Sequence, residues 1–347
     1  MSKLKAFEVK KLDRWFERQK RVLPWRDEPT LYRVWISEIM LQQTQVITVI
    51  PYFERFVARF PTVGVLAAAS LDDVLLHWAG LGYYSRARNI HRTAQMIVEQ
   101  GDFPRTRGDW ISMPGVGEYT AGAILSIALD QPEAILDGNV ERVLSRVYRV
   151  GRGRGDTFYK AQLWEHSRTV VSLASKKKLR PSQINQALME LGATVCTYRK
   201  PKCMVCPLSK ECQANLKNEV EDFPPPKKPK IWIHVQEELH CVVDPSGRIL
   251  LRRREKGEWR AGLWDLLDSK PKGNPLIKVG QVESRHVVTR HKISRTTHIW
   301  KTRKPSALKL NQIWTHGNEV AMGSALKRTL QMIRERYPTV TFNPGCM

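Results

Sequence analysis

Four of the six cysteines lie close together in the sequence, in a pattern that can bind a metal centre. They are Cys196, Cys203, Cys206 and Cys212. Their spacing is Cys-x6-Cys-x2-Cys-x5-Cys, and clustered thiols in a cytosolic chain bind metal more often than they form disulfides. Four thiolates satisfy either a zinc ion or an iron-sulfur cluster. The spacing alone does not choose between the two.

Two carboxylates form a second candidate centre. If residues 31–46, "LYRVWISEIMLQQTQV", are helical, the neighbours of Glu38 at helical spacing are Val34, Trp35, Leu41 and Gln42. Its carboxyl group then lies mostly among apolar side chains, where desolvation raises its pKa. An ordinary alternative is a helical glutamate paired with Arg33.

Asp137 precedes an amphipathic segment, "NVERVLSRVYRV", that starts near Val140. A carboxylate at a helix N-terminus is held in its ionised form. An acid and an anion together are the usual groups for cleaving a glycosidic bond through an oxocarbenium-like transition state. The alternative for Asp137 is a helix N-cap with no chemical role.

The stretch "MPGVGEYTAGAIL", Met113 to Leu125, places a Pro-Gly-x-Gly turn before a segment of small and apolar residues. Two short helices joined by this turn would form a helix-hairpin-helix. The backbone amides of Gly115, Val116 and Gly117 then face outward with the positive end of the helix dipole. Such a device holds one DNA phosphate without reading base sequence.

The charge of the chain points to a polyanionic partner. Among 347 residues, Lys and Arg number 57 against 34 Asp and Glu, which gives a formal net charge of +23. Nucleic acid is the favoured partner, and a basic, solubilised surface is the alternative. No apolar run reaches the roughly 18 residues of a membrane span, and the N-terminus reads as an amphipathic helix. We therefore predict a cytoplasmic protein of bacterial type, associated with the nucleoid, without a targeting segment or a membrane partner.

These groups need a scaffold, which the texture of the sequence predicts in two parts. Residues 30–215 read as short helices separated by turns. The segment "DFPPPKKPK", Asp222 to Lys230, reads as a basic, extended linker. Beyond it, residues 231–244, 248–254 and 284–300 read as strands. We predict a mainly α protein with a C-terminal α+β domain at 231–347.

Seven motifs give the chain a specific resemblance. They are "LPWR" (23–26), "SEIMLQQTQV" (37–46), "GLGYYSRARN" (80–89), "MPGVGEYTAGAI" (113–124), "LDGNVERVLSRVY" (136–148), "NQALMELGATVCT" (185–197) and the four-cysteine pattern. With these motifs the chain resembles the helix-hairpin-helix base-excision DNA glycosylases that carry an iron-sulfur cluster, and within them the adenine DNA glycosylase (MutY) family.

The resemblance implies an architecture. Residues 1–216 would form the catalytic domain, with a six-helix barrel at about 31–130 and a cluster module made of 1–30 and 131–216. A Pro/Lys linker would follow at 217–230, and a Nudix-like domain that recognises the opposing base at 231–347. The cofactor would be one 4Fe-4S cluster, and a monovalent or divalent cation at the hairpin turn is a further expectation.

The resemblance also implies roles for individual residues. Glu38 would protonate the adenine ring and Asp137 would stabilise the sugar cation, with Tyr119 and Asn139 supporting that centre. The residues expected around the extruded adenine are Arg21, Trp25, Leu41 and Gln186. The residues expected to contact the DNA are Gln42, Gln43, Tyr83, Gly115, Val116 and Gly117, with Gln43 and Tyr83 entering the base stack. The cluster ligands would be Cys196, Cys203, Cys206 and Cys212.

In the C-terminal domain, "GEWRAGLWDLL" (257–267) resembles the Trp-containing segment of the family. The Glu-rich Nudix hydrolase signature is absent, so no pyrophosphatase activity is expected. The family's recognition loop commonly reads Phe-Ser-His, and the best local match here is Thr289-Arg290-His291. Arg290 and His291 are therefore expected to contact DNA, with phosphate held more tightly and the lesion read less selectively.

The sequence thus predicts a monomeric, monofunctional adenine glycosylase of base excision repair. Its expected substrate is double-stranded DNA with adenine opposite 8-oxoguanine or guanine. An endonuclease III-like bifunctional pyrimidine glycosylase is disfavoured because that type has Lys where Tyr119 stands, and a phenol cannot form a Schiff base. A thymine-mismatch glycosylase is disfavoured by the attached C-terminal domain. A non-catalytic iron-sulfur DNA-binding protein is disfavoured by the presence of both carboxylates.

Overall fold

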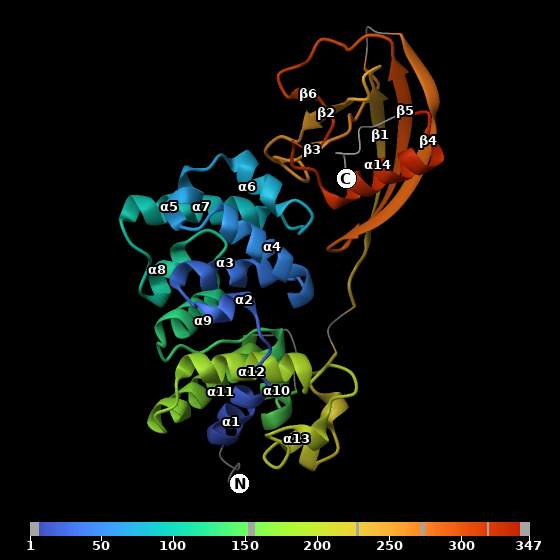
Figure 1. Ribbon diagram of the computed structural model, residues 1–347. Coiled ribbons are helices and arrows are strands. Elements are labelled where there is room, and N and C mark those ends of the chain that lie inside the picture. Colours follow the sequence, from blue (N-terminus) through green and yellow to red (C-terminus); the bar gives the residue numbers. More distant parts are fainter. Residues whose placement is uncertain (1–6, 152–156, 227–228, 272–274, 318, 341–347) are drawn as a thin grey trace. The chain divides into compact units, whose positions relative to one another are not determined.

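The computed structural model describes residues 7–151, 157–226, 229–271, 275–317 and 319–340 (Figure 1). The chain divides into two compact units, residues 1–67 with 92–228 and residues 68–91 with 229–347. The domain boundaries at 216 and 230 that the sequence indicates stay a prediction.

The first unit is helical. Its helices are α1 (Val9–Gln19), α2 (Pro24–Asp27), α3 (Leu31–Leu41), α4 (Val46–Arg59), α5 (Val63–Ala68), α8 (Arg107–Ser112), α9 (Glu118–Leu129), α10 (Gly138–Tyr148), α11 (Thr157–Lys176), α12 (Pro181–Thr194) and α13 (Gln213–Leu216), with the 3-10 turns η1 (Cys203–Val205) and η2 (Val220–Asp222). Helix α7 (Ser85–Gln100) crosses into the second unit.

Local sequence explains where several of these helices begin. Thr30 and Thr106 cap α3 and α8, because each threonine side chain accepts a backbone N–H of the first turn. Pro181 opens α12, where its missing N–H costs no hydrogen bond. Helix α10 carries the predicted apolar stripe, and Val140, Val143, Leu144 and Val147 are all buried.

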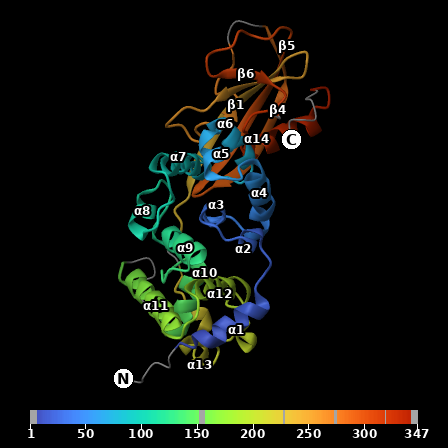
Figure 2. The same ribbon diagram turned by 60° about the vertical axis from the view of Figure 1, so that its left-hand side comes forward.

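Helix α9 differs, because it is buried on nearly all sides. Its residues from Thr120 to Ile127 are all buried, and α3, α8 and α12 pack around it. Helix α12 in turn packs against α1, α10 and α11, an arrangement that Figure 2 shows from a second side. The aromatic rings of Trp35, Phe103 and Trp110 pack together, with centroids 6.1 to 6.5 Å apart.

The second unit holds one mixed sheet. Its elements are α6 (Leu71–Trp78), β1 (Ile233–Val243), β2 (Ile249–Arg253), β3 (Trp264–Asp265), β4 (Leu276–Val288), β5 (His291–Thr302), β6 (Gln312–Thr315) and α14 (Ser324–Arg336). The strand order is β3-β2-β1-β5-β4, with β6 paired to β2. Strands β1 and β5 run parallel, and the other pairs are antiparallel.

The predicted C-terminal α+β fold is confirmed. Helix α14 covers one face of the sheet through Leu326, Leu330 and Ile333, which pack with buried residues of the strands (Figure 1). The turn between β1 and β2 is built on Asp244, whose Oδ1 accepts the backbone N–H groups of Ser246 and Arg248. In the described part of the chain, none of the helices combines the length and apolarity that a membrane crossing requires.

Candidate active site

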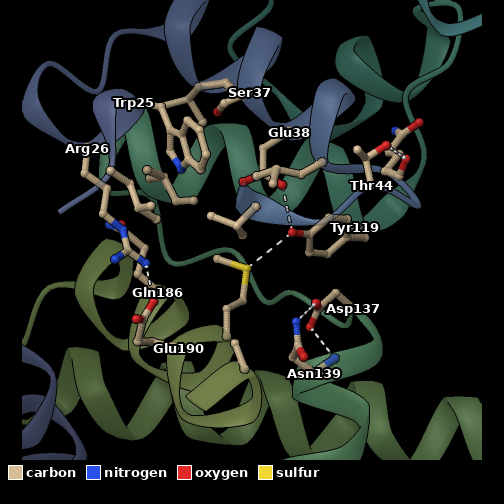
Figure 3. Close-up of a pocket in the computed structure, with 18 of the residues that line it drawn as sticks. Trp25, Arg26, Ser37, Glu38, Thr44, Tyr119, Asp137, Asn139, Gln186 and Glu190 are labelled. Atoms are coloured by element: carbon tan, nitrogen blue, oxygen red, sulfur yellow. Dashed lines mark hydrogen bonds and ion pairs between the residues drawn. The ribbon is translucent and has the colours of Figure 1, made fainter. Parts of the chain in front are cut away.

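Glu38 lies on α3 with its side chain turned into the interior, and it is only 5% exposed. Helix α9 packs against α3 and brings Tyr119 to it, so that the Tyr119 hydroxyl donates a hydrogen bond to Glu38 Oε2 at 2.7 Å (Figure 3). The same hydroxyl lies 3.2 Å from Met189 Sδ on α12. Three helices therefore meet at the Glu38 carboxyl group.

The surroundings of Glu38 favour its protonated form. Burial is the main cause that raises its pKa to about 7, and the nearby charge of Asp137 acts in the same direction. The Tyr119 hydrogen bond and the Arg26 charge oppose the rise. The alternative pairing with Arg33 is not formed, because Arg33 donates to the Pro24 carbonyl instead. A carboxyl group with this pKa can deliver a proton at neutral pH.

Asp137 is the N-cap of α10, as its place in the sequence suggested. Its Oδ1 accepts the backbone N–H groups of Asn139 at 3.0 Å and Val140 at 2.7 Å, and its Oδ2 accepts the Asn139 side-chain amide at 2.9 Å. The sequence predicts that the helix N-terminus keeps Asp137 ionised, and this stays a prediction; the pKa of Asp137 also responds to burial. Burial raises that pKa above its usual value, and the three hydrogen bonds and Arg142 only reduce the rise. The helix N-terminus was visible in the sequence, whereas the burial was not.

Arg142 anchors the start of α10 to its neighbours. Its Nη2 donates to Asn139 Oδ1 at 2.8 Å and to the Gly192 carbonyl at 2.6 Å, and its Nε donates to the Cys196 carbonyl at 2.6 Å. Gly192 allows this close approach, because an added Cβ would lie 2.6 Å from Asn139 Cβ. Arg142 thus holds the first turn of α10, which Asp137 caps, next to Cys196, the first of the four clustered cysteines.

A cavity of about 470 Å³ brings the predicted site residues together (Figure 3). All four predicted catalytic residues, all four predicted base-binding residues and two of the predicted DNA-contact residues line it. They are Glu38, Tyr119, Asp137, Asn139, Arg21, Trp25, Leu41, Gln186, Gln42 and Gln43. This volume is in the range of pockets that bind small organic groups.

Two further residues of the cavity were missed by the sequence reasoning. Glu190 is 1% exposed and accepts both Arg21 Nε at 2.5 Å and Arg26 Nη2 at 2.9 Å. Arg26 Nε also donates to Gln186 Oε1 at 3.1 Å. Burial alone would raise the pKa of Glu190, but the hydrogen bonds and charges of the two arginines overcome it and lower the pKa. The sequence could have indicated both residues, because Arg26 ends the motif "LPWR" and Glu190 lies one helical turn after the predicted base-binding residue Gln186.

The hairpin turn lies between α8 and α9. Gly115 has φ +80°, a left-handed conformation that favours glycine. Gly117 caps α9 without a side chain, which leaves the first N–H groups of the helix open to an anion. Gln42 connects this turn to the cavity, because its Nε2 donates to the Gly115 carbonyl at 3.4 Å and to Thr120 Oγ1 at 3.3 Å. Gly115, Val116 and Gly117 do not line the cavity itself.

The four predicted cysteine ligands also come together. Cys196, Cys203, Cys206 and Cys212 line one cavity between α10, α12 and α13. Arg146, which is 1% exposed, donates to Cys196 Sγ at 3.3 Å and to the Thr197 carbonyl at 2.7 Å. Within the described ranges, no three His, Cys, Asp or Glu side chains are arranged around a position for a single ion.

Comparison with known proteins places this site in a family. The model of the HhH-GPD superfamily base excision DNA repair proteins matches residues 36–167. The adenine DNA glycosylase of Buchnera aphidicola subsp. Baizongia pistaciae (strain Bp) is 34% identical over 326 residues, which cover 90% of this chain and 86% of that protein. The chain belongs to the adenine DNA glycosylase family. The adenine DNA glycosylase of Buchnera aphidicola subsp. Acyrthosiphon pisum (strain APS) is 44% identical over 60% of this chain, and the match covers 59% of its length, less than two thirds.

The structural comparison agrees with this adenine DNA glycosylase assignment at the level of the fold. A solved structure entitled as a thermostable thymine-DNA glycosylase matches with a TM-score of 0.53 and 26% identity, over 60% of this chain and 95% of that one. The helix-hairpin-helix glycosylase fold predicted from the motifs is therefore confirmed. The chain is thus a member of a family of base excision DNA repair proteins that have this fold.

Adenine DNA glycosylases and their helix-hairpin-helix relatives typically carry a 4Fe-4S cluster. The donor set of this chain fits one, because four thiols line one cavity and a cubane offers four irons, each with one open position. Burial raises the pKa of Cys206 to about 12 and that of Cys212 to about 11. Positive charge from bound iron would stabilise these buried thiolates.

Three residues expected to contact DNA in an adenine DNA glycosylase lie in the second unit. Tyr83 has φ +48° and is 37% exposed. Arg290 and Thr289 form the two-residue turn between β4 and β5, and Thr289 has φ +53°. His291 begins β5, and its ring meets the Trp259 ring edge to face at 4.8 Å. The segment matched to the family's recognition loop is thus a tight hairpin turn.

Proposed function

We propose that this chain is a monofunctional adenine DNA glycosylase, which hydrolyses the N-glycosidic bond of adenine opposite 8-oxoguanine or guanine in double-stranded DNA. The observation that carries the proposal is the buried Glu38 carboxyl group, with a pKa near 7 and a hydrogen bond from Tyr119, in a cavity that also holds Asp137. These are an acid and an anion around a space that accepts one base.

Glu38 supplies the proton in this mechanism. Adenine is a poor leaving group as an anion, and protonation of a ring nitrogen lets it leave as a neutral base. The high pKa of Glu38 keeps a protonated fraction available at neutral pH. After the base leaves, the same carboxylate can accept a proton from the attacking water, which balances the hydrolysis.

Asp137 stabilises the positive sugar that forms as the bond breaks. Its carboxylate is held in one orientation by three donors from the first turn of α10. A fixed anion in a partly desolvated site stabilises a developing cation more than a solvated one does. The phenol of Tyr119 stands in the same cavity and cannot form a Schiff base with the sugar. The DNA backbone is therefore left intact.

The base itself is recognised by the polar end of the cavity. Adenine carries an exocyclic amine that donates and ring nitrogens that accept hydrogen bonds. Oxygens of Glu190 and Gln186 can accept from that amine, and the guanidinium groups of Arg21 and Arg26 can donate to the ring. Trp25 and Leu41 supply apolar walls. The extruded base leaves a gap in the base stack, and Gln43 and Tyr83 fill it. Both residues have a positive φ.

DNA is held by the hairpin and by the net charge of +23. The open N–H groups at the start of α9 take one phosphate, and a monovalent or divalent cation at the turn carbonyls would strengthen that contact. A 4Fe-4S cluster on Cys196, Cys203, Cys206 and Cys212 would fix the loop between α12 and α13. His291 reads the opposing base, and Arg290 contacts the DNA next to it. The protein works as a cytoplasmic monomer.

One experiment tests the proposal directly. Single-turnover cleavage is measured on duplexes with adenine opposite 8-oxoguanine, guanine or cytosine, with and without alkali. We expect excision opposite 8-oxoguanine and guanine, slow excision opposite cytosine, and strand breakage only after alkali. Release of a pyrimidine in place of adenine, or strand breakage without alkali together with borohydride trapping, would overturn the proposal.

The reading of the opposing base is tested separately with variants of the hairpin turn. His291→Ala is expected to slow excision opposite 8-oxoguanine more than opposite guanine, because a base-edge contact is worth about 1 to 3 kcal/mol. Arg290→Ala separates two roles of this side chain. Loss of a phosphate contact would weaken binding to all duplexes and lower the salt dependence, whereas loss of a lesion contact would affect only one opposing base. Equal losses opposite both bases for His291→Ala would remove the lesion-reading role.

A further inference from the structure

The chain approaches Asp137 through a segment that belongs to no helix or strand, residues 130–137. Three consecutive carbonyl groups in it each accept a hydrogen bond from a side chain of a different helix. The pairs are Asn185 Nδ2 to Glu133 O at 2.7 Å, Arg107 Nη2 to Ala134 O at 2.9 Å and Ser167 Oγ to Ile135 O at 2.7 Å. Side chains therefore replace the backbone partners that a sheet would supply.

The donors of two of these contacts are fully buried, whereas the third donor, Arg107, has a side chain that is 26% exposed. Asn185 and Ser167 are 0% exposed, and Ile135 is also fully buried. A buried carbonyl that loses its donor costs about 1 to 3 kcal/mol, so each contact restricts where the segment can lie. Because Asp137 follows directly, the three donors also restrict where its carboxylate can lie.

Arg107 differs from the other two donors, because it also reaches the hairpin. Its Nη1 donates to Glu118 Oε2 at 2.8 Å and to the Glu118 carbonyl at 3.1 Å. Its Nε donates to Glu133 Oε2 at 2.7 Å. One guanidinium thus joins the first residue of α8, the first residue of α9 and the segment that leads to Asp137.

The packing leaves little freedom around this junction. At Gly122 on α9, an added Cβ would lie 2.5 Å from the Ala134 carbonyl oxygen and 2.9 Å from Arg107 Nη2. The Arg107 guanidinium also lies over the Trp164 ring, 5.7 Å from its centroid. Helix α9 and the Ala134 segment are therefore packed closely together, with the planar Arg107 guanidinium beside them.

Glu118 gives the contact an electrostatic role as well. Its carboxylate lies in the first turn of α9, beside the open N–H groups that are proposed to hold a phosphate. A carboxylate there favours the helix but repels a phosphate at the same amides. The Arg107 guanidinium offsets this negative charge at the point where the DNA backbone arrives.

We propose that Arg107 is a positioning residue, which couples the phosphate-binding hairpin to the placement of Asp137. The proposal rests on the proposed glycosylase function. DNA that engages the first turn of α9 acts on Glu118 and Arg107, and through Arg107 on the carbonyls ahead of Asp137. Arg107 does not line the cavity, and its effect on the chemistry passes through Asp137.

The test uses the full chain in excess over an adenine-containing duplex, so that the single-turnover rate constant reports the chemical step and its amplitude reports the active fraction. In Arg107→Met, we expect the rate constant to fall by about 10-fold to 100-fold, the range for a misplaced catalytic group. The matched control is Arg105→Met, which removes the same charge from a side chain that is 57% exposed and pairs with Asp102. It should keep the wild-type rate constant.

Two further variants keep the proposal testable if Arg107→Met folds poorly. Ser167→Ala frees the Ile135 carbonyl and should lower the rate constant while duplex affinity stays near the wild-type value. Glu118→Gln removes the carboxylate beside the open N–H groups of α9, so we expect tighter duplex binding and a salt dependence at least as steep as that of the wild type.

The outcomes separate this proposal from the proposed function. If the wild-type chain does not excise adenine, the glycosylase function itself fails. If the wild type excises adenine while Arg107→Met and Ser167→Ala keep its rate constant, only the positioning role fails. A loss of amplitude at an unchanged rate constant means that Arg107 serves stability alone, which also overturns the positioning role.

Discussion

The Tyr119 hydroxyl and the Glu38 carboxyl group are joined by a hydrogen bond of 2.7 Å between helices α9 and α3. This bond opposes the effect of burial on Glu38, and the pKa of Glu38 is about 7 as a result of both. The carboxyl group can therefore act as an acid at neutral pH. Tyr119, in turn, is a neutral phenol, because burial and the two nearby carboxylates raise its pKa well above the usual value.

Replacement of the acid should remove base excision. In Glu38→Gln, size and hydrogen bonding to Tyr119 are retained, but no proton can be delivered. We expect the excision rate to fall by about 100-fold to 10,000-fold, while the affinity for the duplex is retained. The control is Glu28→Gln, an exposed carboxylate a few residues before α3. Wild-type-like excision by Glu38→Gln would remove Glu38 from the mechanism.

The pH dependence of excision should follow the Glu38 carboxyl group. Its acid form is the active one, so the single-turnover rate should fall as the pH rises through about 7. The Tyr119 hydrogen bond favours the carboxylate and lowers the pKa. Tyr119→Phe should therefore move this falling limb to higher pH. A limb that stays in place, or moves to lower pH, contradicts the assignment.

The same carboxyl group should make stability depend on pH. The pKa of Glu38 is about 7 in the folded protein against its ordinary value of 4.5, so the folded state binds the proton more tightly. The contribution of this carboxyl group to the free energy of unfolding is then greatest below about pH 4.5, and it is lost as the pH rises to about 7. Glu38→Gln lacks this loss, so between pH 4 and pH 8 the difference in the free energy of unfolding between variant and wild type should change by about 3 kcal/mol in favour of the variant. Denaturant unfolding at pH 4 and pH 8 checks this, and a difference that does not grow with pH would refute it.

If Cys196, Cys203, Cys206 and Cys212 bind a 4Fe-4S cluster, the cluster should colour the protein. Pure protein should be yellow-brown and contain about four irons and four sulfides per chain. Cys203→Ser should lower the iron content, the unfolding temperature and DNA binding together, because the ligands share one loop. Cys241→Ser, a buried cysteine of the sheet, serves as the control. Stoichiometric zinc without sulfide in protein prepared without oxygen would rule out the cluster.

The sequence by itself determined the local features of this protein. Apolar residues at helical spacing predicted the buried face of α10, and Asp137 fell at a helix start. Alternating runs predicted β1 and β2, but residues 284–300, which read as one strand, are divided between β4 and β5 by the turn at 289–290. The four cysteines were readable as one site from their spacing. These features depend on residues a few positions apart, whose relation is set by the geometry of a helix, a strand or a turn.

The tertiary structure decided the rest, because it depends on which distant residues meet. Glu38 and Tyr119 are 81 positions apart, and Arg21 and Glu190 are 169 apart, so no local pattern pairs them. The raised pKa of Asp137 likewise follows from burial, which comes from the elements packed around α10. Desolvation and long-range hydrogen bonds arise only when the chain has folded, and they turn a set of readable residues into an acid, an anion and a cavity for one base.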